Sequence, residues 1–352
     1  MKKVTIKDIA KEAGVSVGTV QRALNNFGRL SPETREKVKK CAKKMGYEPS
    51  YIAQTFATGK TYNIGVICPQ FNGGVFDLII NETEARAYEK GYVICLGESK
   101  MDQVQEKNYL SLMQRRKADG IIITPFTERG EENSYSYLAE INRTTPLVVI
   151  EQNIDFPGLN VIATDNYFNV YETVKYLFSH NRKRIGFLHW GSVPWDFAQR
   201  DRLKGYKDAV RDLNLPDLSF TPGERSCPID REKIKDYIET KKPEIIIGLF
   251  DFYTIEIMKH LYSLGLRVPQ DIEVIGYDNL PITEIMFPSL SSIAQPAKEI
   301  GRRSFEILMN NIEKKGQPPV RELIKGSLVL RNSTHKDLMP TGKTDIPIIT
   351  DY

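Results

Sequence analysis

The chain has 352 residues, of which 41% are hydrophobic and 27% are charged, and its formal net charge is +4. This composition is typical of a soluble protein of two or three domains, and no stretch approaches the roughly 20 apolar residues that a membrane span needs. The start MKKVTIKDIA lacks the apolar region of a secretory signal, and the four cysteines and four histidines show no metal-ligand spacing. We therefore expect a cytoplasmic protein without a metal or another cofactor.

Charge is distributed unevenly along the chain. Residues 1–60 contain 13 Lys and Arg against 5 Asp and Glu, a net charge of +8, whereas the remainder contains 36 against 40, a net charge of −4. A small basic segment joined to a mildly acidic body is typical of a polyanion-binding module attached to a second function. A solvated charged surface would give the same count.

Two helices separated by a very short turn are predicted near the N-terminus. Thr5 is a good N-cap with Asp8 in the capping-box position, and Gly14 supplies a left-handed stop. Only one residue separates Gly14 from Ser16, the next N-cap. Helices joined so tightly cannot lie antiparallel, so they must cross steeply, as in a helix-turn-helix. A third helix is predicted at SPETREKV, with Pro32 at its first position.

One side of the second helix has no apolar partners within this small module. That side carries Val17, Gly18, Gln21, Arg22 and Asn25. Arg22 can give bidentate hydrogen bonds to guanine, and Gln21 can pair similarly with adenine. Val17 can contact a thymine methyl group, and Gly18 lets the backbone approach a groove closely. The alternative is a polar helix face that contacts only water.

From Tyr62 onward the pattern alternates between short β-rich runs and helical stretches. The runs include NIGVICP, GIIITPF and PLVVIEQN, and a second series includes RIGFLHW, EIIIGLFD and IEVIGYD. Such alternation predicts an α/β protein with parallel sheets covered on both faces, here two doubly wound subdomains.

Ligands bind such sheets beyond the carboxyl ends of the strands. In this chain those positions carry carboxylates, amides and aromatic rings, a set that suits a polyhydroxylated ligand. The composition favours a neutral or acidic carbohydrate over a nucleobase. The strand ends carry Pro69-Gln70-Phe71, Thr124-Pro125-Phe126, Glu151-Gln152, Asp165-Asn166, Trp190-Gly191, Phe250-Asp251 and Tyr277-Asp278, and the segment AQRDRLKGY adds Arg200 and Arg202.

The stretches TIKDIAKEAGVSVGTVQRALN, SPETREKVKKCAKKMGYEPS and IAQTFATGKTYNIGV resemble the lactose-repressor/galactose-repressor family of bacterial transcription regulators. The resemblance extends to about Arg331. It implies a fold with a three-helix head, a hinge helix and a body like a periplasmic binding protein. The implied bounds are 1–48 for the DNA-binding head, 49–60 for the hinge, 61–338 for the effector-binding and dimerisation domain (one subdomain about 61–163 and 293–325, the other about 164–292 and 326–338), and 339–352 for a flexible tail.

The resemblance also implies roles for single residues. In the head, Val17, Gly18 and Arg22 would read bases, while phosphate contacts would come from Thr5, Ser16, Thr19 and Asn25. In the hinge, Ala53 and Phe56 would lie at the minor groove, with Phe56 as the wedge where the family commonly has leucine. The family usually has serine in place of Gln21, a difference that predicts an altered operator or altered phosphate contacts.

In the body, Arg202 and Asp278 match the family's effector-binding arginine and aspartate. Glu151, Asp165, Phe71, Trp190, Trp195 and Asp251 lie near other pocket positions of the family. Two departures stand out: Phe250 precedes Asp251 where a polar residue is usual, and Asn181-Arg182 replaces the common Gly-His. The tail lacks leucine heptads, so we expect a homodimer on a near-palindromic operator.

Three classes of function compete for this sequence. A ligand-responsive DNA-binding repressor of carbohydrate-utilisation genes accounts for both the head and the body. An enzyme is disfavoured because the body shows no P-loop, GxSxG or dinucleotide fingerprint. A sugar-transport component would need an export signal and no DNA-binding head. A regulator that answers to a protein partner, or to a purine-like corepressor, is the alternative within the first class.

Overall fold

The structure is a computed structural model, and it divides the chain into two compact units, Met1–Tyr62 and Asn63–Tyr352. It describes residues 4–24, 28–47, 55, 59–71, 73–126, 135–191, 197–223, 229–314, 316–339 and 344–351. None of the described helices is both long and apolar enough to span a bilayer.

The first unit contains α1 (Ile6–Ala13), α2 (Val17–Leu24) and α3 (Pro32–Lys44) within its described residues. The predicted local signals are confirmed: Thr5 and Asp8 form a complete capping box, and Gly14 ends α1 with φ of 64°. The Ser31 side chain accepts a hydrogen bond from the Thr34 N–H at the start of α3. The ends of these helices could be predicted because each cap depends only on residues close in sequence.

Seven buried aliphatic side chains form the core of this unit. They come from all three helices: Ile9, Ala10, Ala13, Val20, Ala23, Val38 and Ala42. Leu24, Cys41 and Met45 pack around this core and are only partly buried. A core this small fixes the helices but stabilises the module only modestly.

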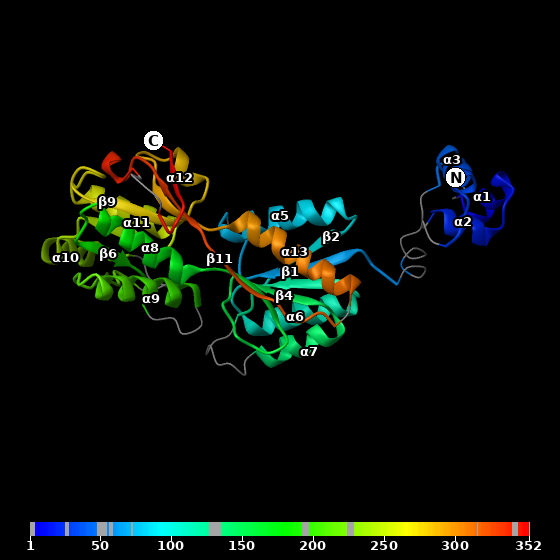
Figure 1. Ribbon diagram of the computed structural model, residues 1–352, viewed down its shortest axis with the longest axis horizontal. Helices are drawn as coiled ribbons and strands as arrows, with labels where there is room; N and C mark the ends of the chain where they lie inside the picture. The colour runs from blue at the N-terminus through cyan, green and yellow to red at the C-terminus, as the bar shows by residue number, and fades with distance from the viewer. Residues whose placement is uncertain are drawn as a thin grey trace. The chain divides into compact units, whose positions relative to one another are not determined.

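The second unit contains the expected pair of doubly wound sheets, which confirms the predicted fold class (Figure 1). All pairs in the first sheet are parallel, and Val66 of its β1 lies between Leu96 and Ile122 of the neighbouring strands. The strand order is β11 (Arg321–Ile324), β5 (Asn160–Thr164), β4 (Leu147–Ile150), β3 (Gly120–Ile123), β1 (Asn63–Cys68) and β2 (Val93–Glu98). We call this part of the unit the first lobe.

Helices cover both faces of the first sheet. In Figure 1, α5 (Val75–Glu89) and α13 (Ala297–Glu313) lie together on one face, and α6 (Gln103–Arg115) and α7 (Ser136–Thr144) lie on the other. Both faces of the central strands are therefore buried, which explains why β3 and β4 are continuous apolar runs instead of alternating patterns.

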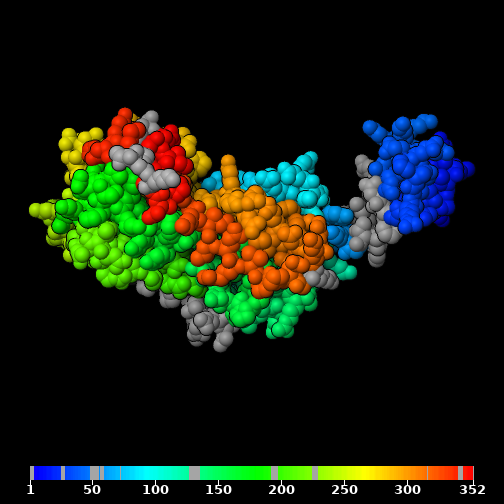
Figure 2. Space-filling view, viewed as in Figure 1, coloured from blue at the N-terminus to red at the C-terminus, as the bar shows by residue number. Residues whose placement is uncertain are grey.

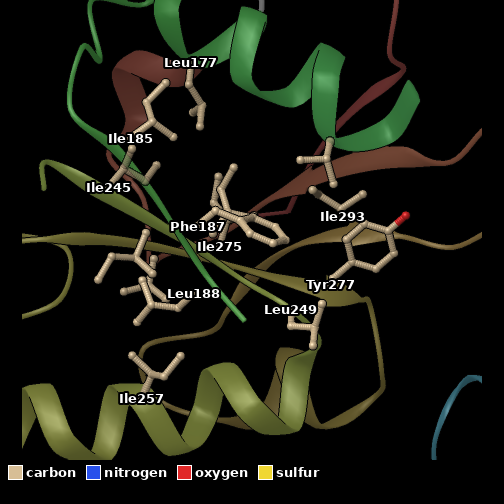
Figure 3. Packing of buried hydrophobic residues seen from close by; sticks show 14 of the residues in the cluster. Leu177, Ile185, Phe187, Leu188, Ile245, Leu249, Ile257, Ile275, Tyr277 and Ile293 are labelled. Atoms are coloured by element: carbon tan, nitrogen blue, oxygen red, sulfur yellow. The ribbon is translucent and has the colours of Figure 1, made fainter. Parts of the chain in front are cut away.

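The second lobe is built around the second sheet. Its helices are α8 (Asn166–Ser179), α9 (Phe197–Asp212), α10 (Arg231–Lys241), α11 (Asp251–Ser263) and the short α12 (Ile282–Ile285). Figure 3 shows Leu177 of α8 and Ile257 of α11 packing on opposite sides of the strands. The strand order is β13 (Ile348–Thr350), β12 (Ser327–Leu330), β10 (Ser291–Ala294), β9 (Glu273–Asp278), β8 (Ile245–Gly248), β6 (Ile185–Leu188) and β7 (Leu218–Phe220), and only the β10–β12 pair is antiparallel.

The chain passes between the two sheets three times. It leaves the first sheet after β5, returns after β10 to form α13, and leaves again between β11 and β12. Gly326 lies in the last crossing, where a Cβ would stand 2.2 Å from the Ala294 carbonyl oxygen. The two lobes are therefore joined by three short crossing segments that run side by side. Such a connection permits hinge motion.

The expectation of a flexible tail is wrong for the described residues 344–351. Residues 348–350 form β13, which pairs in parallel with β12, and Ile346 is 1% exposed. In Figure 2 the red C-terminal segment lies on the second lobe. The polar, proline-containing composition hid the role of Ile346 and Ile348, which pack against the core of the second lobe beside β12. Covering a sheet edge in this way is favourable.

The departure at Asn181-Arg182 has a structural explanation. Asn181 adopts φ of 65° just after α8, where the common glycine would also fit. The Arg182 guanidinium lies 2.7 Å from Glu273 Oε2 and 2.7 Å from Asp337 Oδ1, so it fastens β9 to the residues that follow β12.

Candidate functional site

The exposed side of α2 is the first candidate site. Val20 and Ala23 face the core, while Val17, Gly18, Gln21 and Arg22 are exposed, and Val17 retains 39% of its accessible surface. The Ser16 hydroxyl accepts a hydrogen bond from the Thr19 N–H at 3.1 Å and so caps the helix. The sequence-predicted set therefore shares one accessible surface, except for Asn25, which lies outside the described residues, as do Ala53 and Phe56 of the hinge.

Arg22 folds back along α2 in this structure. Its Nε donates to the Gly18 carbonyl oxygen at 3.1 Å, and its Nη2 lies 3.5 Å from the Thr19 hydroxyl. Thr5 is exposed as well, but its hydroxyl donates to Asp8 within the capping box at 2.7 Å. The two Arg22 contacts are solvent-exposed, so the Arg22 side chain can turn toward a polyanion at little cost, whereas Thr5 would have to give up part of its capping box.

The second candidate site is a cavity of about 600 Å³ between the two lobes. Thr124 follows β3 and Glu151 follows β4, whereas Trp190 and Phe250 follow strands of the second lobe. These are carboxyl ends of strands, where doubly wound sheets bind ligands. The predicted residues that line it are Glu151, Trp190, Arg202, Phe250 and Asp278.

Arg202 anchors the cavity from α9. It is 6% exposed, and its guanidinium lies 3.6 Å from the centroid of the Tyr277 ring. Its Nε donates to Asn166 Oδ1 at 2.8 Å, and its Nη1 donates to the Leu249 carbonyl oxygen at 2.6 Å. Its Nη2 lies 3.7 Å from Asp278 Oδ1. These bonds hold the guanidinium in one orientation at the cavity wall.

A hydrogen-bonded chain connects the two acids of the cavity. Gln295 Nε2 donates to Asp278 Oδ1 at 2.6 Å, and the Thr164 hydroxyl lies 2.8 Å from Gln295 Oε1 and 3.1 Å from Glu151 Oε1. Burial raises the pKa of Glu151 to about 7, an effect that hydrogen bonds from Thr164 oppose. Burial likewise raises the pKa of Asp278 to about 6, and the Arg202 charge opposes that rise.

Aromatic rings form the apolar part of the wall. Trp190 and Phe250 meet edge to face with centroids 4.8 Å apart, and Tyr253 stands 5.9 Å behind Trp190. Phe126 contributes a ring from the first lobe, and its N–H donates to the buried Glu106 carboxylate at 2.7 Å. Rings in both lobes can stack on the apolar faces of a bound ring.

Several predicted residues lie away from the cavity. The Asp165 carboxylate caps α8 by accepting from the Phe168 N–H, and Arg200 is exposed and stacks on Phe197. Asp251 is fully buried and accepts hydrogen bonds from the Leu280 N–H and the Ser292 hydroxyl, both at 2.7 Å. These three side chains therefore have structural partners instead of facing the cavity.

Two further residues predicted for the cavity, Phe71 and Trp195, are not found in its described lining. The Phe71 N–H donates to Glu98, and its side chain is not among those that line the cavity. Trp195 lies outside the described residues. Four further lining residues lie at the predicted strand ends, namely Gln70, Thr124, Phe126 and Gln152. The prediction omitted Phe76, Gln199, Phe252 and Gln295, which also line the cavity. Gln199 could have been found from its place one turn before Arg202 on α9.

The described lining has hydrogen-bonding groups, rings and fixed charges, the equipment for binding a small polar molecule. In the described ranges, no group of three or more His, Cys, Asp or Glu is placed to hold a metal ion. Fold and sites together define a class: a ligand-binding body of two lobes joined to a helix-turn-helix head.

Comparison with known proteins agrees with that class. Residues 5–50 match the family model for bacterial regulatory proteins of the lacI family, and residues 174–334 match the model for a periplasmic binding protein-like domain. The predicted resemblance to the lacI family of bacterial regulatory proteins is thus confirmed: the head matches that family's model, and the body matches a periplasmic binding protein-like domain. The chain is therefore a DNA-binding transcriptional regulator and, like the family, not an enzyme.

Relatives resemble the chain over nearly its whole length. The HTH-type transcriptional regulator DegA of Bacillus subtilis (strain 168) is 29% identical over 336 residues, covering 94% of this chain and 98% of DegA. The HTH-type transcriptional repressor PurR of Vibrio vulnificus (strain CMCP6) is 28% identical over 341 residues, covering 94% and 99%. A Lac repressor dimer bound to operator and the anti-inducer ONPF has the same fold, with a TM-score of 0.80 at 23% identity, covering 95% of this chain and 99% of that one.

Proposed function

We propose that this regulator is a repressor of carbohydrate-utilisation genes whose operator affinity is controlled by a sugar-like effector in the cavity between the lobes. The observation that carries this proposal is the cavity wall itself. It places the Arg202–Asp278 pair, side-chain amides and the Trp190–Phe250 ring pair around one space of about 600 Å³. Charged and amide groups bond hydroxyls, while rings stack on the apolar faces of a sugar.

On the DNA side, α2 enters the major groove of each half of a near-palindromic operator. Arg22 and Gln21 contact base edges, Val17 contacts a thymine methyl group, and Gly18 allows close approach. Phosphate contacts come from Thr5, Ser16, Thr19 and Asn25. Two copies of the chain form a homodimer in the cytoplasm, and their hinges, residues 49–60, pair over the minor groove, where Ala53 makes contact and Phe56 inserts as a wedge.

Effector binding changes DNA binding through the body. The effector closes the two subdomains, about 61–163 with 293–325 and about 164–292 with 326–338, and this closure shifts the dimer interface and disorders the hinges. Coupling of about 1–3 kcal/mol, a 5- to 150-fold change in operator affinity, is typical of such systems. The same architecture allows a corepressor, which would strengthen operator binding instead.

A second candidate follows from the aromatic wall. The ring pair of Trp190 and Phe250 would also receive a flat heterocycle, so a non-sugar metabolite such as a purine, acting as a corepressor, is the alternative effector. A protein partner that acts on the body is the other alternative, and it would leave the cavity without a ligand.

A thermal-shift panel tests the proposal. Sugars, uronic acids, sugar phosphates and purines are added to the wild type, to Asp278→Ala and to the exposed control Glu232→Ala. A ligand at 100 times its dissociation constant stabilises the fold by about 2.7 kcal/mol. The proposal predicts a shift from a carbohydrate that is absent only in Asp278→Ala. A shift from purines alone supports the corepressor, and no shift at all contradicts a small-molecule effector.

A further inference from the structure

The charges around the cavity are unbalanced. Of the described residues that line it, only Glu151, Arg202 and Asp278 carry acidic or basic side chains. Two carboxyl groups therefore share one guanidinium. The imbalance matters because a charge inside a protein must be paired or neutralised.

The Arg202 guanidinium already has partners within the protein. Its charge faces Asp278 at 3.7 Å, and two of its nitrogens donate to Asn166 and to the Leu249 carbonyl oxygen. An anionic ligand would have to share this guanidinium with Asp278 and would also face Glu151. The described wall is therefore poorly suited to a uronic acid or a sugar phosphate.

Glu151 is the acid without a basic partner. It is 6% exposed, and no Lys, Arg or His of the described residues lies within 4.0 Å of its carboxylate. Its bonds come from the Thr164 N–H at 3.1 Å and from the Thr164 hydroxyl. That hydroxyl has a single proton, and it also lies 2.8 Å from the acceptor Gln295 Oε1.

The single proton cannot serve both acceptors. If Glu151 is protonated, its hydroxyl donates to Thr164, and Thr164 donates to Gln295, so every group is satisfied. If Glu151 is ionised, one acceptor loses its donor unless a further donor enters from the cavity. The backbone supports a role in binding, since Glu151 holds φ of 57°, a left-handed conformation that is uncommon for a residue with a Cβ.

We propose that the effector carries a positively charged amino group that pairs with Glu151, and that it is therefore an amine-bearing carbohydrate. The ammonium group supplies both the missing charge and the missing donor, while the hydroxyl groups bind the amides and Asp278. This inference rests on the proposed function of the cavity and narrows its ligand class. It replaces the expectation of a neutral or acidic carbohydrate.

Binding of such a ligand releases a proton at mildly acidic pH. In the free protein, burial and the nearby Asp278 raise the pKa of Glu151 to about 7, and Arg202 and Thr164 oppose the rise. The ammonium group favours the ionised carboxylate, so the proton leaves on binding. Affinity for the amine therefore rises as the pH increases from 5 to 7.

The test uses matched sugars and the full-length chain. Isothermal titration calorimetry compares glucose, glucosamine and glucuronate, and the corresponding galactose and mannose series, with adenine and hypoxanthine as non-sugar probes. The variants are Glu151→Gln and the exposed control Glu232→Gln. We expect an amino sugar to bind at least about 10-fold more tightly than its neutral partner, the range of a charge-assisted hydrogen bond. Glu151→Gln should abolish this preference, and Glu232→Gln should keep it.

The outcomes separate this inference from the proposed function. A neutral or acidic sugar that binds as tightly as its amine partner overturns the inference and leaves a carbohydrate effector standing. Binding of adenine or hypoxanthine alone overturns both, and so does the absence of binding by all nine sugars. If Glu151→Gln fails to fold, the wild type is titrated with the amino sugars at pH 6 in buffers of different ionisation enthalpy. Release of a proton on binding supports pairing of the amine with Glu151, and binding without proton release contradicts it.

Discussion

Arg22 is the side chain on which the proposed recognition of bases depends most. It is exposed on α2, and among the described residues it bonds to Gly18 and Thr19 of its own helix. Replacing it with alanine removes a potential bidentate contact to guanine, so Arg22→Ala should cost about 1–3 kcal/mol of operator binding and relax the preference at one base pair. Selection from random duplexes, followed by titration of the selected operator, measures both effects.

Lys40→Ala is the matched control for Arg22→Ala, because it removes one positive charge from an exposed position on α3. It should weaken binding to all duplexes alike and leave the base preference intact. If Arg22→Ala behaves in the same way as Lys40→Ala, Arg22 contacts phosphate and the proposed reading of bases is wrong.

Glu106 makes the stability of the body depend on pH. It is fully buried, and it accepts hydrogen bonds from the Phe126 N–H and the Tyr137 hydroxyl. Burial raises its pKa from 4.5 to about 7, although both bonds and Lys107 oppose the rise. The protonated form is thus preferred in the fold. Its contribution is complete below about pH 4.5 and is lost as the pH rises through 7.

Glu106→Gln keeps the hydrogen-bond acceptor but cannot titrate. Between pH 5 and pH 8, the free energy of unfolding of the wild type should fall relative to the variant, by at most about 3 kcal/mol at 1.36 kcal/mol per pKa unit. Urea unfolding at both pH values measures the difference, with the exposed Glu89→Gln as control. Parallel curves for wild type and Glu106→Gln would show that Glu106 does not titrate in this range.

At the scale of single elements, we expect Gly18 to lower the stability of α2 and to favour the proposed binding of DNA. A Cβ at this position would meet only the Ser16 hydroxyl, at 3.9 Å, so Gly18→Ala should stabilise the head by about 1 kcal/mol of helix propensity. The added methyl group should nevertheless weaken operator binding, on the order of 1–3 kcal/mol for a tight contact. Thermal unfolding measures the expected gain in stability, and operator titration measures the expected loss of affinity. Unchanged affinity would mean that the backbone does not approach the groove.

The C-terminal strand should contribute measurably to the second lobe. Ile346 is 1% exposed within the core cluster, whereas Ile349 on β13 is 51% exposed. Ile346→Ala should therefore cost about 2–5 kcal/mol of unfolding free energy. Ile349→Ala should cost under about 0.5 kcal/mol. Equal effects in chemical denaturation would indicate that the tail does not pack as the structure shows.

The success of sequence-based prediction differs between elements and side chains. Caps such as Thr5 and the central apolar strands could be predicted because local pattern determines them. The side chain of Asp251 could not be placed, because packing decides its direction. It turns toward Gly276, where a Cβ would stand only 2.2 Å from its Oδ1. Gln295 was missed because it enters the cavity from a crossing between the lobes, which sequence pattern does not reveal.

At the scale of the whole molecule, the proposed regulation requires that ligand binding in the body be coupled to DNA binding by the head. The cavity lies between two lobes joined by three crossings, so a ligand that bonds both sides can change how the lobes meet. A ligand shifts this equilibrium only by its difference in affinity for the two states. The coupling is also reciprocal, so operator DNA must change effector affinity by the same factor.

The most direct test of this account is a titration of labelled operator with the full-length chain by fluorescence anisotropy, with and without a saturating amount of the ligand found in the calorimetric panel. The account predicts that the ligand changes operator affinity by about 5- to 150-fold. In Asp278→Ala, operator affinity should no longer respond to that ligand concentration. A ligand that binds the cavity while operator affinity stays the same would contradict the central claim that the cavity controls the head.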